Sequence, residues 1–251
     1  MDAAFQVAEL RPSRGGVWLT EAFNLFRRKP FAWIGLCTAW LLITVALVQV
    51  GPIGAAIGNF LQPVFFASFA IAAFRQVAGE QVLMSDLFAG FRRNLRSLVM
   101  LGAILVLLEL AVLILMWVLL GMPEISQDET PEKISEYIQS LKGKEWILLI
   151  GFGLSALVKG AFWFAPPLIA FHDMQTSQAM RWSVYAAISN IGAMLVYGTL
   201  LVGFMILAII PWGLGLLVVI PVMVISTFVG YREVFEGERA PPAPPPPSES
   251  A

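Results

Sequence analysis

Long uninterrupted apolar runs dominate the chain and predict helices that cross a membrane. A helix needs about 20 apolar residues to cross the hydrocarbon core, and six runs reach this length. They are residues 31–50, 53–74, 98–121, 146–171, 191–210 and 212–231. Because the runs are continuous, helices are favoured over the short alternating strands of a barrel. We predict an all-α fold, a polytopic bundle of six transmembrane helices.

The composition agrees with a lipid environment. Of the 251 residues, 58% are hydrophobic and 13% are charged, whereas soluble domains are roughly 45–50% apolar and about 25% charged. A soluble fold of this length could not cover so much apolar surface with polar groups. The net charge of −1 gives no electrostatic reason to expect a nucleic-acid partner.

The distribution of lysine and arginine predicts the direction of the spans, because these residues are concentrated in cytoplasmic connections. With the N-terminus inside, the cytoplasmic segments carry Arg11, Arg14, Arg27, Arg28, Lys29, Arg75, Arg92, Arg93, Arg96, Arg181, Arg232 and Arg239. The opposite side carries Lys133, Lys142 and Lys144, and Lys159 lies within a span. We therefore predict that both termini are cytoplasmic.

Polar segments flank and interrupt the predicted membrane domain, residues 15–236. Residues 1–14 form an N-terminal cytoplasmic segment, and residues 237–251 form a proline-rich tail that we expect to be extended and disordered. Residues 122–145 form an acidic extracytoplasmic loop, in which residues 131–138 have the pattern of a short amphipathic helix. This loop either packs over the bundle as a solvated connection or captures a ligand.

A threefold pattern indicates that the membrane domain is built from three similar units. Each pair of spans is preceded by an amphipathic stretch, at residues 18–29, 85–94 and 177–190. We predict three hairpins, each preceded by a helix in the cytoplasmic interface with its apolar face in the acyl chains. The basic residues expected to contact lipid phosphates are Arg27, Arg28, Lys29, Arg92, Arg93 and Arg96. Alternatively, these helices only anchor and orient the next span.

Proline placement follows the same pattern. The outward spans contain no proline, whereas the returning spans contain Pro63, then Pro166 with Pro167, then Pro221. A proline within a helix removes a backbone donor and kinks it, which membranes tolerate where neighbouring groups bind the freed carbonyl. Each unit is therefore predicted to combine a straight outward helix with a kinked return helix.

Polar residues within the spans are the main candidates for a site. Glu109 lies near the middle of the third span and Lys159 near the middle of the fourth, at similar depths. Because each isolated charge at mid-bilayer costs at least about 2.5–3.5 kcal/mol, we predict that they form an ion pair, directly or through water. This pair either fixes the hairpin or belongs to a transport site. A second polar cluster, Asn59 and Gln62, could bind a neighbouring helix or line a cavity.

No pattern of catalytic or cofactor-binding residues is present. The chain has no phosphate loop, zinc-type spacing, nucleophile elbow or dinucleotide-binding glycine pattern. The single cysteine, Cys37, cannot form an internal disulfide, and the single histidine, His172, cannot build a bis-histidine haem site. We expect no catalytic residue, no metal, no cofactor and no enzyme activity.

Several short motifs together resemble a known family. In order they are Leu25-Phe26-Arg27-Arg28-Lys29-Pro30, Gly51-Pro52-Ile53-Gly54, Pro63, Asp86-Leu87-Phe88-Ala89-Gly90-Phe91, Phe164-Ala165-Pro166-Pro167-Leu168 and Tyr231-Arg232-Glu233-Val234-Phe235. Taken together, they resemble the uncharacterised proteobacterial family of BPSS-type inner-membrane proteins. The resemblance runs from Gly16 to Phe235 and omits the acidic loop and the tail. It implies a bacterial inner-membrane location and a six-helix body, and it implies no activity.

Three function classes remain open at this point. The leading hypothesis is a non-enzymatic scaffold or envelope-associated factor that acts through membrane lipids, a protein partner or a second copy of itself. The alternative is a small-solute or ion transporter with a pathway near Glu109 and Lys159. A membrane enzyme acting on lipid would instead need polar groups to converge near Arg92, His172 and Asp173.

Overall fold

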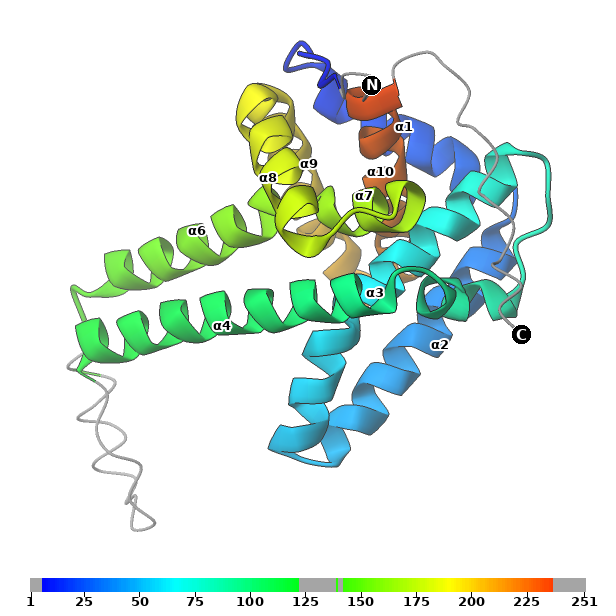
Figure 1. Cartoon of the computed structure of the whole chain (residues 1–251). Helices are drawn as coiled ribbons and strands as arrows, with labels where there is room; N and C mark the ends of the chain where they lie inside the picture. Colours follow the sequence, from blue (N-terminus) through cyan, green and yellow to red (C-terminus); the bar gives the residue numbers. More distant parts are fainter. Residues whose placement is uncertain (1–5, 122–138, 140–141, 237–251) are drawn as a thin grey trace. The chain divides into compact units, whose positions relative to one another are not determined.

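The computed structural model describes residues 6–121, 139 and 142–236, and this part of the chain is helical and contains no strand (Figure 1). The helices are α1 (Arg14–Phe26), α2 (Pro30–Gln49), α3 (Pro52–Val77), the 3-10 helix η1 (Met84–Arg92), α4 (Leu95–Leu120), α6 (Glu145–Ala161), α7 (Ala165–His172), α8 (Thr176–Ser189), α9 (Ile191–Ile209) and α10 (Leu216–Glu236). The predicted all-helical class is confirmed.

Six helical stretches in the described residues are long and apolar enough to cross a membrane, and each overlaps one predicted span. They are Pro30–Gln49, Pro52–Val77, Leu95–Leu120, Glu145–His172, Ile191–Ile209 and Leu216–Glu236. Since a transmembrane helix needs about 20 apolar residues, the number and position of the spans agree with the sequence pattern. The protein is a transmembrane helix bundle.

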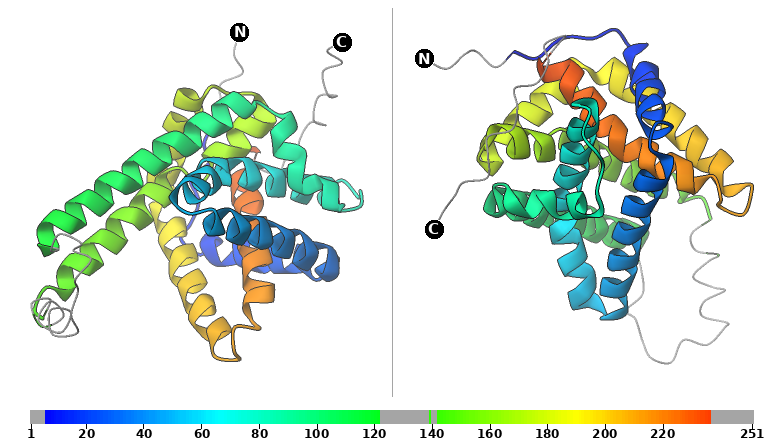
Figure 2. Two further views of the ribbon diagram at one scale, coloured as in Figure 1. Left: turned by 90° about the horizontal axis from the view of Figure 1, so that it is seen from below. Right: turned by 90° about the vertical axis from the view of Figure 1, so that its right-hand side faces the viewer.

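The chain divides into two compact units, Met1–Ala103 with Ala161–Ala251, and Ile104–Gly160. In the first unit, α3 and α10 are the most buried of the spans. Helix α3 contacts α2, η1, α7 and α10, and α10 contacts α1, α2 and α9. Figure 2 shows the turns at the ends of two helix pairs, α2 with α3 and α9 with α10. These contacts make α3 and α10 the centre of the first unit.

Aromatic side chains in the C-terminal parts of α3, α7 and α10 form the core of this unit. The ring of Phe171 stacks on that of Tyr231 with 5.4 Å between centroids, and it lies 5.7 Å from the ring of Phe74. Phe228 contacts both Phe74 and Phe171 at 6.4 and 6.1 Å. Such offset and edge-on pairs add attraction beyond the area they bury, so α3, α7 and α10 are held together at this end.

The second unit is formed by the larger part of α4 together with α6. Met116, Leu120 and Ile147 form a buried cluster with Val112 packed against it. Gly151 provides the space for the Met116 side chain, because a Cβ atom at residue 151 would overlap the Met116 sulfur. A glycine in α6 thus allows close approach of the two helices.

The predicted fourth span is interrupted, which corrects its prediction as one kinked helix. Helix α6 ends at Ala161 and α7 begins at Ala165, because Pro166 and Pro167 lack the N–H groups that would continue the helix. The hydroxyl of Ser183 accepts a hydrogen bond from the Phe164 N–H at 3.1 Å and donates to the Ala161 carbonyl at 2.8 Å. The broken backbone is therefore satisfied by a side chain of α8, as an apolar environment requires.

The second amphipathic segment, predicted at residues 85–94, is the 3-10 helix η1. The cap residue is Leu83, whose N–H donates to the Asp86 carboxylate at 2.8 Å. Asp86 also forms an ion pair with Arg75 of α3. At the other end of the segment, a Cβ at Gly90 would overlap the Val64 carbonyl oxygen, so η1 lies directly on the backbone of α3. Asp86 and Gly90, the two residues that attach η1 to α3, are close together in sequence, which favours a short, tight helix.

Part of the apolar face of each amphipathic segment packs against protein, whereas Phe23, Phe88 and Ile188 are exposed. Trp18, Leu19 and Ala22 of α1 are at most 5% exposed and lie in the interface with α9 and α10. Leu87 of η1 is buried against α3, and Ala179 of α8 is fully buried. The sequence pattern identifies an apolar face but does not distinguish protein from lipid as its neighbour.

The remaining structural predictions concern the prolines and the polar segments. Pro63 lies inside α3 and Pro221 inside α10. Most of the predicted acidic loop, residues 122–138 and 140–141, and the whole proline-rich tail, residues 237–251, lie outside the described residues.

Candidate functional site

The structure places the two predicted intramembrane charges together within the second unit. The Lys159 ammonium on α6 lies 2.8 Å from one carboxylate oxygen of Glu109 on α4. The Ser155 hydroxyl, one turn before Lys159, donates to the other oxygen at 2.8 Å. The Lys159 side chain is 61% exposed and that of Glu109 is 32% exposed. Both carboxylate oxygens have partners, so this is a paired and neutral cluster rather than an isolated charge.

The second predicted cluster, Asn59 and Gln62, does not join a neighbouring helix through its asparagine. The Asn59 amide donates to the Ala55 carbonyl of its own helix at 3.0 Å, and Asn59 is exposed. Gln62 lies half-buried on the same helix, one residue before Pro63. This geometry gives Asn59 a local role in α3.

The predicted phosphate-contacting residues lie at the ends of two amphipathic segments. Arg27, Arg28 and Lys29 follow the last residue of α1, and all three are exposed. Arg92 and Arg96 are exposed around the end of η1, and Arg93 is half-buried. These positions leave the long cationic side chains able to reach an anionic surface.

A polar network that the sequence analysis did not identify joins α1 to the end of α10. Glu233 forms an ion pair with Arg14, and its other oxygen accepts a hydrogen bond from the Trp18 indole N–H at 2.6 Å. Glu21 lies within 4.0 Å of both Arg14 and Arg232. Because Trp18 is almost completely buried, this network fixes α1 on the bundle through charge-assisted bonds.

The end of α3 carries a similar network, in which a polar side chain also binds a buried tryptophan. Gln76 accepts a hydrogen bond from the indole N–H of fully buried Trp33 at 2.6 Å and donates to the Leu25 carbonyl at 2.8 Å. The sequence contains the signal for both networks, since Phe74-Arg75-Gln76-Val77 and Tyr231-Arg232-Glu233-Val234 share the order aromatic, arginine, polar, valine. In both motifs the third residue binds a tryptophan.

His172, Tyr231 and Glu236 form a third group, which the sequence analysis also did not identify. The His172 Nε2 lies 2.7 Å from the Tyr231 hydroxyl, which donates to a Glu236 oxygen at 3.0 Å. Of the residues near which a membrane enzyme would need polar groups to converge, His172 contacts α10, and the Asp173 carbonyl accepts a hydrogen bond from the Asn94 amide at 3.4 Å. These bonds use His172 to join α7 to α10.

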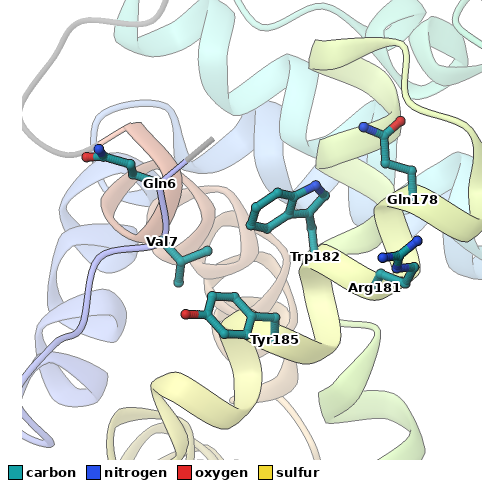
Figure 3. A pocket seen from close by; sticks show the side chains of 6 residues that line it. All are labelled: Gln6, Val7, Gln178, Arg181, Trp182 and Tyr185. Atoms are coloured by element: carbon teal, nitrogen blue, oxygen red, sulfur yellow. The ribbon is translucent and has the colours of Figure 1, made fainter. Parts of the chain in front are cut away.

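The described residues also line an open pocket of about 910 Å³ beside α8. Figure 3 shows Gln178, Arg181, Trp182 and Tyr185 along α8, with the N-terminal segment that carries Gln6 and Val7 beside them. An aromatic pair with an adjacent arginine is typical of residues at a membrane–water interface. No group of three or more histidine, cysteine, aspartate or glutamate residues in the described part of the chain could hold a metal ion.

Comparison with known proteins places the chain in a family. It is 31% identical over 208 residues to a protein of Burkholderia thailandensis named a probable inner membrane protein, and the match covers 78% of this chain and 74% of the relative. The chain belongs to the family of that inner membrane protein. No family model matches the chain. No solved structure matches it either. With its six candidate spans, this family member is an integral, multi-pass membrane protein.

Proposed function

We propose that the protein is a non-enzymatic scaffold or envelope-associated factor of the inner membrane, which acts through contacts with lipids or with another protein. The proposal rests on the polar side chains of the first unit, which hold its helices together. Glu233 and Gln76 each bind a buried tryptophan at 2.6 Å, and Ser183 closes a helix break. These groups build a rigid body, and the basic residues at the segment ends are left at its surface.

We also propose that this body has three hairpins with both termini in the cytoplasm. The short turn at Gly51 between α2 and α3, and the turn at Gly213 between α9 and α10, support paired antiparallel helices. The concentration of arginine at one end of the spans supports the orientation.

Copurification of the full-length chain from native membranes tests the scaffold proposal. The chain is extracted with its surrounding lipid, and bound lipids and proteins are identified against an unrelated six-helix protein expressed to the same level. We expect a lipid enrichment or a stoichiometric protein partner specific to this chain. Identical lipid and protein sets for both proteins would contradict the proposal.

A transporter is the second candidate, because the cluster of Glu109, Lys159 and Ser155 lies on two candidate spans and is partly exposed. Intramembrane charges commonly mark ion or substrate pathways. Uptake or current measurements in vesicles containing the wild-type chain or the Glu109→Gln and Lys159→Met variants distinguish the two functions. Flux that both substitutions abolish while the chain stays folded would favour transport, and equal flux with and without the protein would oppose it.

A further inference from the structure

The first unit contains an open apolar groove lined by α1, α9 and α10. Its volume is about 600 Å³. One wall is formed by a single face of α1, including Gly16, Thr20 and Phe23, and the opposite walls are formed by α9 and α10, including Leu200, Phe204 and Val219. Thr20 directs its hydroxyl to the Gly16 carbonyl of its own helix at 3.1 Å, so the lining presents mainly carbon.

The length of α9 places its wall of the groove in the acyl-chain region. Leu200 and Phe204 lie about 14 and 20 Å along α9 from Ile191, at a rise of about 1.5 Å per residue. The hydrocarbon core is about 30 Å thick, so the groove reaches the depth of the bilayer midplane. Phe23 and Phe204 are 45% and 46% exposed, so the groove is open at its side.

The two ends of the α1 wall differ in charge, because Arg14, next to Ser13 at one end, is paired with Glu233 and Glu21. On α1 the residues that line the groove recur every three or four positions, and Arg27 occupies the next such position after Phe23. The backbone of Arg27 is still helical, so this spacing continues to residue 27. Arg27 and the adjacent Arg28 are exposed. An apolar groove whose α1 wall continues toward two exposed arginines is complementary to an amphiphile with an anionic head.

We propose that this groove binds an acyl chain of an anionic phospholipid, with the phosphate held by Arg27 and Arg28. The proposal deepens the lipid-contact function proposed above and rests on it. A guanidinium binds phosphate through paired hydrogen bonds, and the neighbouring apolar walls bind the chain. The bound lipid would then bridge α1 to the span pair α9 and α10, in addition to the protein contacts already described.

Native mass spectrometry of the full-length chain in mild detergent tests the site with two lipids of identical acyl chains, phosphatidylglycerol and phosphatidylcholine. The Gly16→Leu substitution fills the groove, because a Cβ at residue 16 meets only the Leu200 side chain at 3.5 Å. We expect it to reduce retention of both lipids by at least about tenfold. Gly198→Leu on α9 is the matched control, since a Cβ there meets nothing within 4 Å, and it should leave retention unchanged.

The charge variants test the headgroup contact separately. Arg27→Gln with Arg28→Gln should reduce the preference for phosphatidylglycerol over phosphatidylcholine by about fivefold per charge. Lys142→Gln, which removes an exposed cation of the second unit, is the control and should leave that preference unchanged. If thermal unfolding shows that Gly16→Leu is misfolded, Thr20→Trp replaces it as the groove-filling variant, because Thr20 lines the groove and is exposed.

Three outcomes would overturn the lipid site. They are unchanged lipid retention in a folded groove-filled variant, equal retention of the two lipids by the wild-type chain, and a dimer that the groove-filling substitution abolishes. A partner that still copurifies from native membranes after any of these outcomes would leave the broader scaffold function standing.

Discussion

At the scale of single residues, the pair of Glu109 and Lys159 makes a prediction about coupling. Replacing Glu109 by Gln leaves Lys159 without the carboxylate that lies 2.8 Å away, so an ammonium group in a span loses its neutralising partner. We expect Glu109→Gln to lower the free energy of unfolding by about 1 kcal/mol more in the wild-type chain than in a Lys159→Met background. Denaturation in mixed micelles measures all four variants of this cycle.

The serine in the same cluster supplies a control for the cycle. Ser155→Ala removes the hydroxyl that donates to Glu109 at 2.8 Å but leaves both charges in place, so its effect should be smaller than that of Glu109→Gln. Equal effects of Glu109→Gln in the two backgrounds would show that the ion pair does not contribute to the stability of the second unit.

Two adjacent glycines make a second prediction at this scale. A Cβ at Gly15 would overlap the Ala193 carbonyl and lie 2.7 Å from the Tyr197 backbone nitrogen, whereas a Cβ at Gly16 would meet only a side-chain methyl at 3.5 Å. Gly15→Ala should therefore displace α1 from α9 and cost about 1–3 kcal/mol, and Gly16→Ala should be close to neutral. Thermal unfolding of both variants measures the difference, and equal midpoints would contradict the close approach of α1 to α9.

At the scale of helices, the 3-10 helix depends on one buried carboxylate. Asp86 is 2% exposed and is bound both by Arg75 and by the Leu83 N–H. Asp86→Ala should lower stability by about 2 kcal/mol, because it leaves a charged and a backbone donor without their acceptor. Hydrogen–deuterium exchange should increase over residues 83–93. Glu80→Ala, which removes the exposed second partner of Arg75, is the control and should change exchange there much less.

The helices also show why only part of the fold could be predicted from the sequence. The spans are predictable because a bilayer sets a minimum apolar length, and Glu109 and Lys159 could be paired because burial of either charge alone is costly. The break before Pro166 also has a local cause, but the groups it frees are bound by Ser183, a residue of another helix. The burial of the α1 apolar face was not predictable, because lipid and protein interiors are similarly apolar.

At the scale of the molecule, the internal repeat provides the clearest link between sequence and structure. The related motifs that end with Val77 and Val234 each supply a polar acceptor for a tryptophan indole. The aromatic first residues of these motifs, Phe74 and Tyr231, both contact the ring of Phe171. In the described residues, α3, α7 and α10 therefore meet at these aromatic rings, and the two rings that begin the related motifs hold equivalent positions around Phe171.

The orientation of the whole molecule makes the last prediction, and the single cysteine makes it straightforward to test. Cys37 is buried, and Cys37→Ala gives a cysteine-free background for single cysteines at Val50, Glu80 and Trp212. Val50 is 71% and Trp212 98% exposed, and both lie at turns that the proposed orientation puts outside. In intact cells a membrane-impermeant thiol reagent should label cysteines at residues 50 and 212 but not at residue 80, which should react only after permeabilisation. Labelling of residue 80 alone in intact cells would invert the topology, and with it the side on which Arg27 and Arg28 meet lipid phosphates.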